Sequence, residues 1–229
     1  MYMKKIADVD VTSLYDEIEM SCWENLPDVG YGPKAAWGGT QLQEMINHKK
    51  WFGDAFNNYT GTISKELKDI LLPDFCPTEF YFYYPNMQKF LFWFNEIYGG
   101  KFARVVYYKT PAGKSVNTHI DAQADKYVKN TPQKISPERK EALYFNKDRF
   151  HLVISGEYTY TVETHDEDII YDMSNLRLYE FDNPLIECFR GGEMWWFNNK
   201  RPHTSYNHSD TSKINLVFDV EGSHWRNML

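Results

Sequence analysis

Short segments rich in β-branched and aromatic residues follow one another from residue 101 to the end of the chain. They are KFARVVYYK, SVNTHI, RFHLVIS, EYTYTVE, NLRLYEF, IECFRG, GEMWWFN and KINLVFDV, with turn-forming residues between them. Short strands at regular intervals, separated by turns, are typical of an all-β sandwich or barrel. The sequence therefore predicts a mainly β structure over residues 101–229.

The first hundred residues show helical signals instead. Four segments carry them: TSLYDEIEMSCW, TQLQEMINHKKWF, SKELKDILLP and NMQKFLFWFNEIYGG. The first starts with hydroxyl residues, the second contains a Thr40–Gln43 capping box, and the last ends at paired glycines. We expect residues 1–100 to form a mostly helical layer packed on the β-sandwich, an α+β arrangement within one domain over residues 1–229.

The composition narrows the class of protein. Of 229 residues, 42% are hydrophobic and 17% aromatic, which is enough for a packed core. The net charge is −7 and lysines and arginines form no stripe, so we expect no nucleic-acid partner. We see no apolar run of the ~18–20 residues that a membrane span needs, and no signal-peptide core at the start. Three widely spaced cysteines indicate a reducing compartment, so we expect a cytoplasmic protein without a membrane partner.

The stretch NTHIDAQ places His119 and Asp121 two residues apart at the end of a predicted strand. Alternate side chains of a strand lie on one face, so these two would point the same way. Two histidines and one carboxylate on one face make the facial triad that suits non-haem Fe(II) and leaves positions open. His151 and His203, both in or next to predicted strands, are the candidates for the third ligand. An exposed ion pair is the alternative.

Two similar patterns lie in turn-like sequence, at His165–Glu167 and His208–Asp210. For both, a solvated loop is the better interpretation. The pair at the end of a strand is therefore the one that we assign to a metal site.

Cationic residues fall on the same predicted inner faces. Arg149 and His151 share a face of one strand, and Lys213 starts the strand that follows His203. Such groups are costly to bury without partners. A metal and a dicarboxylate would satisfy them together, whereas exposed lysine and arginine side chains paired with nearby acids are the alternative.

The order HID…RFHLVISG…GGEMWWFNNKRPHTSYN…KINLVFD resembles the aspartyl/asparaginyl β-hydroxylase family of Fe(II)- and 2-oxoglutarate-dependent dioxygenases. It is most similar to the branch that includes bacterial free-proline hydroxylases, and it covers roughly residues 102–221. The resemblance implies a double-stranded β-helix, a cupin-like jelly roll, with iron at one mouth. It also implies that O2 hydroxylates an unactivated carbon of an amino acid, a peptide or a related small molecule, with release of succinate and CO2.

The resemblance also implies roles for individual residues. The three that match the iron ligands are His119, Asp121 and His203. Those that match positions binding the 2-oxoglutarate cosubstrate are Arg149, His151, Lys213, Tyr108 and Asn207, although a turn role explains Asn207 equally well.

This chain departs from the family at two places. Lys213 stands where the family has an arginine, so a single ammonium replaces a bidentate fork. A polar insert over residues 122–148 is longer than the family's usual connection, and we expect it to cover the substrate. Two other functions stay open: a cupin-like metalloenzyme without 2-oxoglutarate, and a catalytically inactive jelly-roll binding module.

Overall fold

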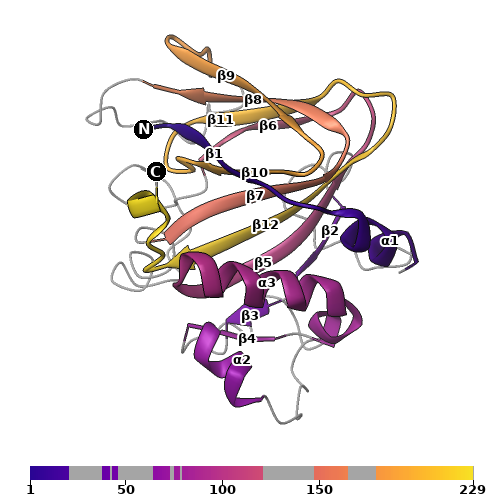
Figure 1. Ribbon diagram of the computed structural model, residues 1–229. Helices are drawn as coiled ribbons and strands as arrows, with labels where there is room; N and C mark the ends of the chain where they lie inside the picture. The colour runs from indigo at the N-terminus through magenta and orange to yellow at the C-terminus, as the bar shows by residue number, and fades with distance from the viewer. Residues whose placement is uncertain are drawn as a thin grey trace.

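Two antiparallel sheets form the body of the protein (Figure 1). The computed structural model describes residues 1–20, 38–41, 43–45, 64–72, 75–77, 79–120, 147–164 and 179–228. The large sheet consists, in spatial order, of β1 (Met3–Asp8), β10 (Glu193–Phe197), β7 (Lys147–Ser155), β12 (Lys213–Glu221), β5 (Lys101–Thr110) and β2 (Gly38–Gln41). The small sheet consists of β6 (Ser115–His119), β11 (His203–Asn207), β8 (Glu157–Glu163) and β9 (Pro184–Arg190).

The chain winds back and forth between the two sheets. It passes from β5 to β6, from β7 to β8, from β9 to β10 and from β11 to β12, each time from one sheet to the other. This winding of antiparallel strands into two facing sheets is a double-stranded β-helix, or jelly roll. The predicted fold class is confirmed.

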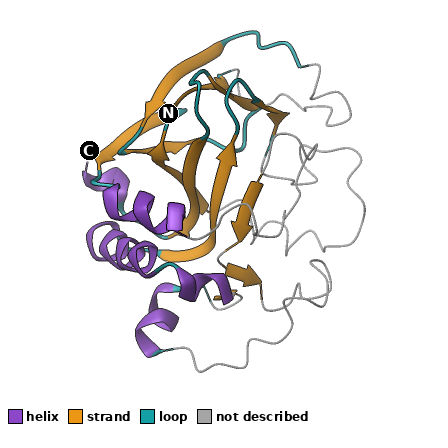
Figure 2. Ribbon diagram, turned by 90° about the vertical axis from the view of Figure 1, so that its right-hand side faces the viewer, coloured by secondary structure: helices purple, strands orange, loops and turns teal. Residues whose placement is uncertain are grey.

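Helices gather on one side of the sheets, as Figure 2 shows. They are α1 (Thr12–Met20), α2 (Lys65–Ile70), α3 (Pro85–Tyr98) and the short 3-10 helices η3 (Glu79–Tyr83) and η5 (Trp225–Met228). Local sequence signals mark the start of α2 and the end of α3. Ser64 caps α2, because its Oγ accepts a hydrogen bond from the Leu67 N–H at 3.2 Å. Gly99 ends α3 with a φ of 66°.

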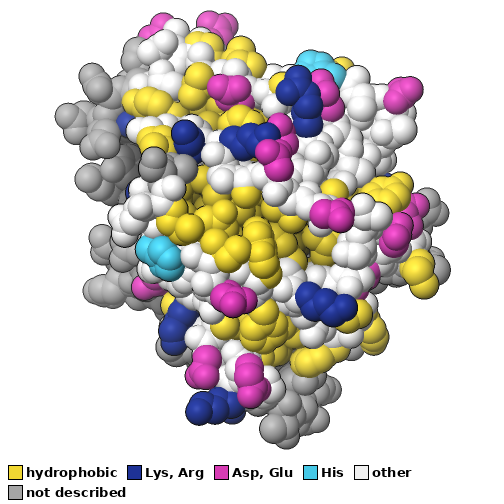
Figure 3. Space-filling model, in the orientation of Figure 1, with side chains coloured by type: hydrophobic (Ala, Val, Ile, Leu, Met, Phe, Trp, Pro, Cys, Tyr) yellow, Lys and Arg dark blue, Asp and Glu magenta, His cyan; other side chains and the backbone are white. Residues whose placement is uncertain are grey.

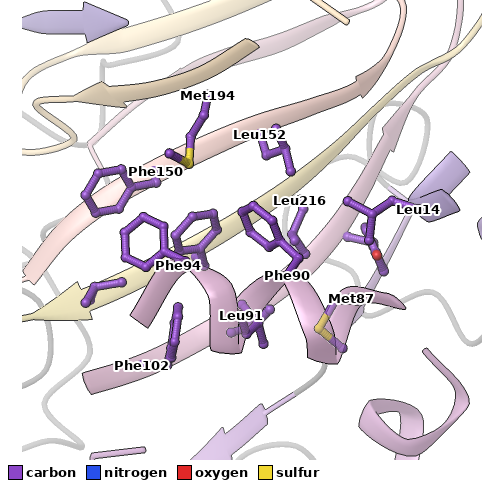
Figure 4. Packing of buried hydrophobic residues seen from close by; sticks show 14 of the residues in the cluster. Leu14, Met87, Phe90, Leu91, Phe94, Phe102, Phe150, Leu152, Met194 and Leu216 are labelled. Atoms are coloured by element: carbon purple, nitrogen blue, oxygen red, sulfur yellow. The ribbon is translucent and has the colours of Figure 1, made fainter. Parts of the chain in front are cut away.

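The outer face of the large sheet is apolar and packs against α3. Phe94 of α3 lies edge-on to Phe150 of β7 and Phe218 of β12, with ring centroids 5.0 and 4.9 Å apart (Figure 4). Leu152 and Leu216, on the same faces of these strands, extend the contact. In Figure 3, hydrophobic side chains cover the middle of this side of the molecule, with charged side chains of both signs around them. Burial of this face holds the helical layer on the sheet.

The inner face of the large sheet is unusually polar. Along β12 the residues that alternate with the apolar outer row are Lys213, Asn215, Val217 and Asp219, and all four are buried. A second hydrophobic cluster, which includes Tyr158, Tyr160 and Phe197, fills part of the space between the sheets. Polar groups in a sandwich interior are costly unless they find partners. This half of the interior is therefore where a binding site is expected.

The structure corrects part of the predicted helical layer. Residues 38–41 are strand β2, paired with β5, and residues Gln43–Met45 are strand β3, paired with β4 (Phe75–Pro77). The predicted helix start at Thr40 is therefore wrong, because pairing with β5 outweighs the local capping pattern. The chain start is also a strand, β1, at the other edge of the large sheet.

Other expected segments fall partly outside the described residues. The insert 122–148 does so, except that Lys147 and Asp148 begin β7. Of the segment NLRLYEF, only residues 179–181 are described, and they are not strand. Within the described ranges, no helix is long and apolar enough to cross a membrane.

Candidate functional site

A cavity of about 50 Å³ lies between the two sheets, with strands of both sheets in its walls. This volume holds a few water molecules. Six of the eight predicted site residues line it: Tyr108, His119, Arg149, His151, His203 and Lys213. Asp121 lies outside the described residues, and Asn207 is not among the lining residues. The structure thus brings six residues that are distant in the sequence to the wall of one cavity.

His119 and His203 face each other at one part of the cavity. They are opposite partners in the pairing of β6 with β11, and their ring centroids are 4.2 Å apart. Each ring holds its Nδ1 against a backbone carbonyl two residues earlier, His119 at 2.7 Å from Asn117 O and His203 at 2.8 Å from Arg201 O. A carbonyl only accepts, so each Nδ1 carries the proton and each Nε2 keeps a lone pair. This is the orientation that metal-ligating histidines adopt.

The aromatic wall around His203 fixes its ring. Tyr160 stacks on the ring at 5.6 Å and 18°, and Phe197 packs against it at 5.3 Å. His203 is only 2% exposed. The side chain is therefore confined to one orientation before any ligand arrives.

The strand register decides between the two candidates for the second histidine. His151 lies on the opposite sheet from the pair, with its Nδ1 3.1 Å from the Tyr158 hydroxyl. His203, and not His151, lies against His119. Within the described ranges, no group of three or more His, Cys, Asp or Glu residues has the placement of a complete metal site. Asp121 stays the predicted third ligand.

Lys213 lies buried in the wall of the same cavity. Its Nζ donates a hydrogen bond to the Ser205 Oγ at 3.0 Å and lies 3.5 Å from the centroid of the Tyr158 ring. Among the described residues, none places a carboxylate against it. Burial lowers the pKa of Lys213 to about 7. An ammonium in this position meets no anion among the described residues, and a bound carboxylate would supply one.

Arg149 also reaches the cavity, but its guanidinium is already paired. Its Nε and Nη2 donate to the two carboxylate oxygens of Asp219 at 2.6 and 2.7 Å, and both side chains are buried. Asp219 was not predicted as a site residue. Its position six residues after Lys213, on the same strand face, is the signal that could have identified it.

Asn207 has a structural role. Its Nδ2 donates to the carbonyls of Thr110, Pro111 and Thr211, and its Oδ1 accepts from Ser209. The amide thereby ties together the turns at the ends of β5 and β11. The turn interpretation of this residue is the one that the geometry favours.

Besides Asp219, four further polar residues at the site were not predicted: Tyr158, Tyr160, Ser205 and Asn215. Ser205 and Asn215 follow His203 and Lys213 by two residues, so strand alternation could have placed them on the same face. The two tyrosines lie on β8, where only the sheet pairing brings them beside the cavity. Of the two neighbouring tryptophans, Trp196 is in the core and Trp195 is half-buried, as the alternation predicts.

No protein-family model matches the chain, and no curated protein sequence matches it. Among solved structures, an oxalate oxidase is similar with a TM-score of 0.32 and 11% identity, over 52% of this chain and 41% of the other. The cupin domain of CENP-C from Drosophila melanogaster is similar with a TM-score of 0.30 and 10% identity, over 50% and 59%. This chain thus matches less than two thirds of either structure. At identities this low, neither likeness says what this chain binds or catalyses.

Proposed function

We propose that this chain is an Fe(II)- and 2-oxoglutarate-dependent dioxygenase that hydroxylates an unactivated carbon of an amino acid, a peptide or a related small molecule. One observation carries the proposal: a buried lysine and two oriented histidines share a single cavity. A structural core has no need of these groups and is weakened by them. A metal ion at the histidines and a diacid at the lysine would satisfy both.

The histidine pair fits a metal such as iron. Both Nε2 atoms hold lone pairs, because both Nδ1 atoms donate to carbonyls. Asp121, two residues after His119, would add the carboxylate. Two imidazoles and one carboxylate leave positions open for a chelating cosubstrate and for oxygen.

The lysine end of the cavity fits the far carboxylate of a diacid. Lys213 Nζ supplies a positive charge with further N–H donors. Ser205 accepts from Lys213, so its own proton is directed to another acceptor. Together these two side chains offer a carboxylate a charge-assisted and a neutral hydrogen bond.

The remaining residues orient the reactants and exclude water. When bound, the iron and 2-oxoglutarate supply the oxidative chemistry. Tyr160 and Phe197 wall the histidine end and hold His203 in place. Rigid strands of both sheets fix the distance between the metal-binding and the cationic ends.

Anaerobic titration with Fe(II) and 2-oxoglutarate tests the proposal. We expect the visible charge-transfer absorbance of a chelate to appear in the wild type and to be lost in His119→Ala and His203→Ala. His208→Ala, which removes an exposed histidine outside the cavity, is the matched control and should leave the absorbance unchanged. Equal absorbance in all four proteins would show that the histidine pair does not hold the iron.

A second candidate is a cupin-like metalloenzyme that uses no 2-oxoglutarate. The Arg149–Asp219 pair favours it, because a guanidinium that is already neutralised attracts a second anion less strongly. Metal titration followed by calorimetry with 2-oxoglutarate separates the two functions. Metal binding with no heat from 2-oxoglutarate, and no effect of Lys213→Met, would support the second candidate.

A further inference from the structure

A series of stacked aromatic rings leads away from the histidine pair. Tyr160, which lines the cavity, stacks on His203 with ring centroids 5.6 Å apart and an interplanar angle of 18°. Phe189 stacks on Tyr160 at 5.2 Å and 6°, and Trp195 stacks on Phe189 at 4.5 Å and 8°. These four rings, the aromatic stack, come from strands β11, β8, β9 and β10. The stack begins at a predicted metal ligand and ends at a half-buried tryptophan.

Every step of the aromatic stack is close to parallel. The rings around α3 show mixed orientations instead, with Phe94 edge-on to Phe150 and Phe218 while these two stack on each other. Edge-to-face and offset-stacked pairs both pack well, so core stability alone does not demand a run of parallel rings. Parallel rings overlap the π orbitals of their neighbours, which favours the transfer of electrons between them.

The chemistry of the rings also suits electron transfer. A phenol and an indole lose an electron more easily than a phenyl ring, so Tyr160 and Trp195 are the oxidisable members and Phe189 is the bridge between them. Trp195 donates its Nε1–H to Glu193 Oε2 at 3.0 Å, and Glu193 is paired with Lys5. The carboxylate stabilises positive charge on the indole and is in place to take up its proton.

We propose that Tyr160, Phe189 and Trp195 form an electron-transfer path between the metal-binding end of the cavity and the outer end of the aromatic stack. The inference rests on the proposed function, because that function generates an oxidant at the histidine pair when O2 reacts in the absence of a substrate. Such an oxidant would otherwise attack His119 and His203. The path carries the oxidising equivalent to a residue that a soluble reductant reaches.

The electrons and protons of this path balance. Tyr160 gives one electron to the oxidised metal centre and regains one from Trp195 through Phe189. Trp195 is then the oxidised residue, and its Nε1 proton passes to Glu193. A thiolate or ascorbate anion returns one electron to Trp195, and the proton comes back from Glu193. The reductant has lost one electron, the metal centre has gained one, and every residue of the path is unchanged.

Mass-spectrometric mapping of oxidised residues tests the path in the iron-loaded protein. The protein is given Fe(II), 2-oxoglutarate and O2 without a substrate or a reductant, so that oxidised Trp195 is left to combine with oxygen. We expect Trp195 to gain one or two oxygen atoms, and added ascorbate to prevent this gain. Trp93 is the internal reference, because it is also half-buried but lies on α3, outside the aromatic stack. Oxidants that diffuse through solution would modify both tryptophans alike.

Tyr160→Phe removes the oxidisable ring beside His203 and keeps a ring of the same shape. We expect Trp195 to lose its oxidation in this variant, and His203 to be oxidised more. Tyr206→Phe makes the same change at an exposed tyrosine of β11 outside the aromatic stack, and its oxidation pattern should match that of the wild type. The charge-transfer absorbance with Fe(II) and 2-oxoglutarate reports whether each variant is folded and holds iron.

Pulse radiolysis of the metal-free protein tests the aromatic stack without iron. Azide radicals oxidise accessible tryptophans, and electron transfer from a tyrosine appears as conversion of tryptophanyl into tyrosyl absorbance. We expect the amplitude of this intramolecular conversion to be smaller in Trp195→Phe and in Tyr160→Phe than in the wild type. Adding Tyr160→Phe to Trp195→Phe should cause no further loss, because the two residues act in one path.

The outcomes separate this inference from the proposed function. Equal conversion in the wild type, Trp195→Phe and Tyr160→Phe would overturn the path, whatever the iron chemistry. Oxidation of Trp93 as extensive as that of Trp195, or Trp195 oxidation that persists in Tyr160→Phe, would overturn it too. If the conversion depends on both residues but the wild type gives no absorbance with Fe(II) and 2-oxoglutarate, then the stack transfers electrons and the proposed function is wrong.

Discussion

Replacement of Lys213 by methionine should make the protein more stable while abolishing diacid binding. Methionine is apolar, unbranched and similar in length, so it fills the same space without a charge. Burial lowers the pKa of Lys213 from 10.5 to about 7, so the native state is destabilised at pH values at which the lysine is charged in the unfolded chain. At a pH near 7 this penalty corresponds to about 4 kcal/mol. Loss of the Ser205 hydrogen bond and the Tyr158 contact offsets part of it, so we expect a net gain of about 2 kcal/mol.

The pH dependence of the wild type follows from the same lowered pKa. Between about pH 7 and 10.5 the unfolded chain holds the Lys213 proton and the native state does not, so stability rises with pH. The slope is up to about 1.4 kcal/mol per pH unit, or about 2 kcal/mol between pH 7 and pH 9. The methionine variant lacks this contribution, so its advantage over the wild type should shrink across that range.

Urea denaturation of both proteins at several pH values measures this difference. Lys114→Met, at an exposed turn, is the control, and its free energy of unfolding should equal that of the wild type at each pH. If Lys213→Met is no more stable near pH 7, and its difference from the wild type is flat up to pH 9, then Lys213 is not an uncompensated buried ammonium.

Three further predictions concern the surroundings of the cavity. Binding of 2-oxoglutarate should weaken above about pH 7, by up to about tenfold per pH unit, because Lys213 loses the charge that a carboxylate needs. Calorimetry at several pH values measures the affinity. An affinity that stays constant with pH would refute the prediction. Asp219→Asn should lower the free energy of unfolding, measured by urea denaturation, by about 3–5 kcal/mol, because it leaves the buried Arg149 guanidinium without its anion. Combining Asp219→Leu with Arg149→Met should restore most of that loss, and a double variant as unstable as Asp219→Asn would argue against a paired charge. Gly156→Ala should cost about 1–3 kcal/mol and also weaken diacid binding, because Gly156 has a φ of 83° and an added Cβ would lie 3.0 Å from the Lys213 Cα. Gly113→Ala is the control: Gly113 has a φ of 64° and no neighbour within 4 Å, so this variant should lose stability but keep diacid binding. If both glycine variants lost diacid binding, backbone strain in general would be the cause.

Local pattern was sufficient for seven strands from residue 101 onward, β5 to β10 and β12, and for the helices at Thr12, Lys65 and Pro85, but it did not identify β11. Alternation along a strand depends only on backbone geometry, so the shared face of Arg149 and His151 could be predicted without knowledge of their partners. Helix caps are equally local.

Pairing between distant strands decided what local pattern could not. Residues 38–45 carry a helix-like capping signal, yet they form strands because the edge of β5 and the strand β4 offer backbone partners. The same kind of pairing sets His119 opposite His203, rather than His151, and brings the β8 tyrosines to the cavity. It also gives Arg149 its partner Asp219 and leaves the Asn215 Oδ1 buried without a hydrogen-bond partner among the described residues. Hydrogen bonds of a sheet join residues far apart in the chain, so a register that decides a site is a property of the whole fold and not of any one segment.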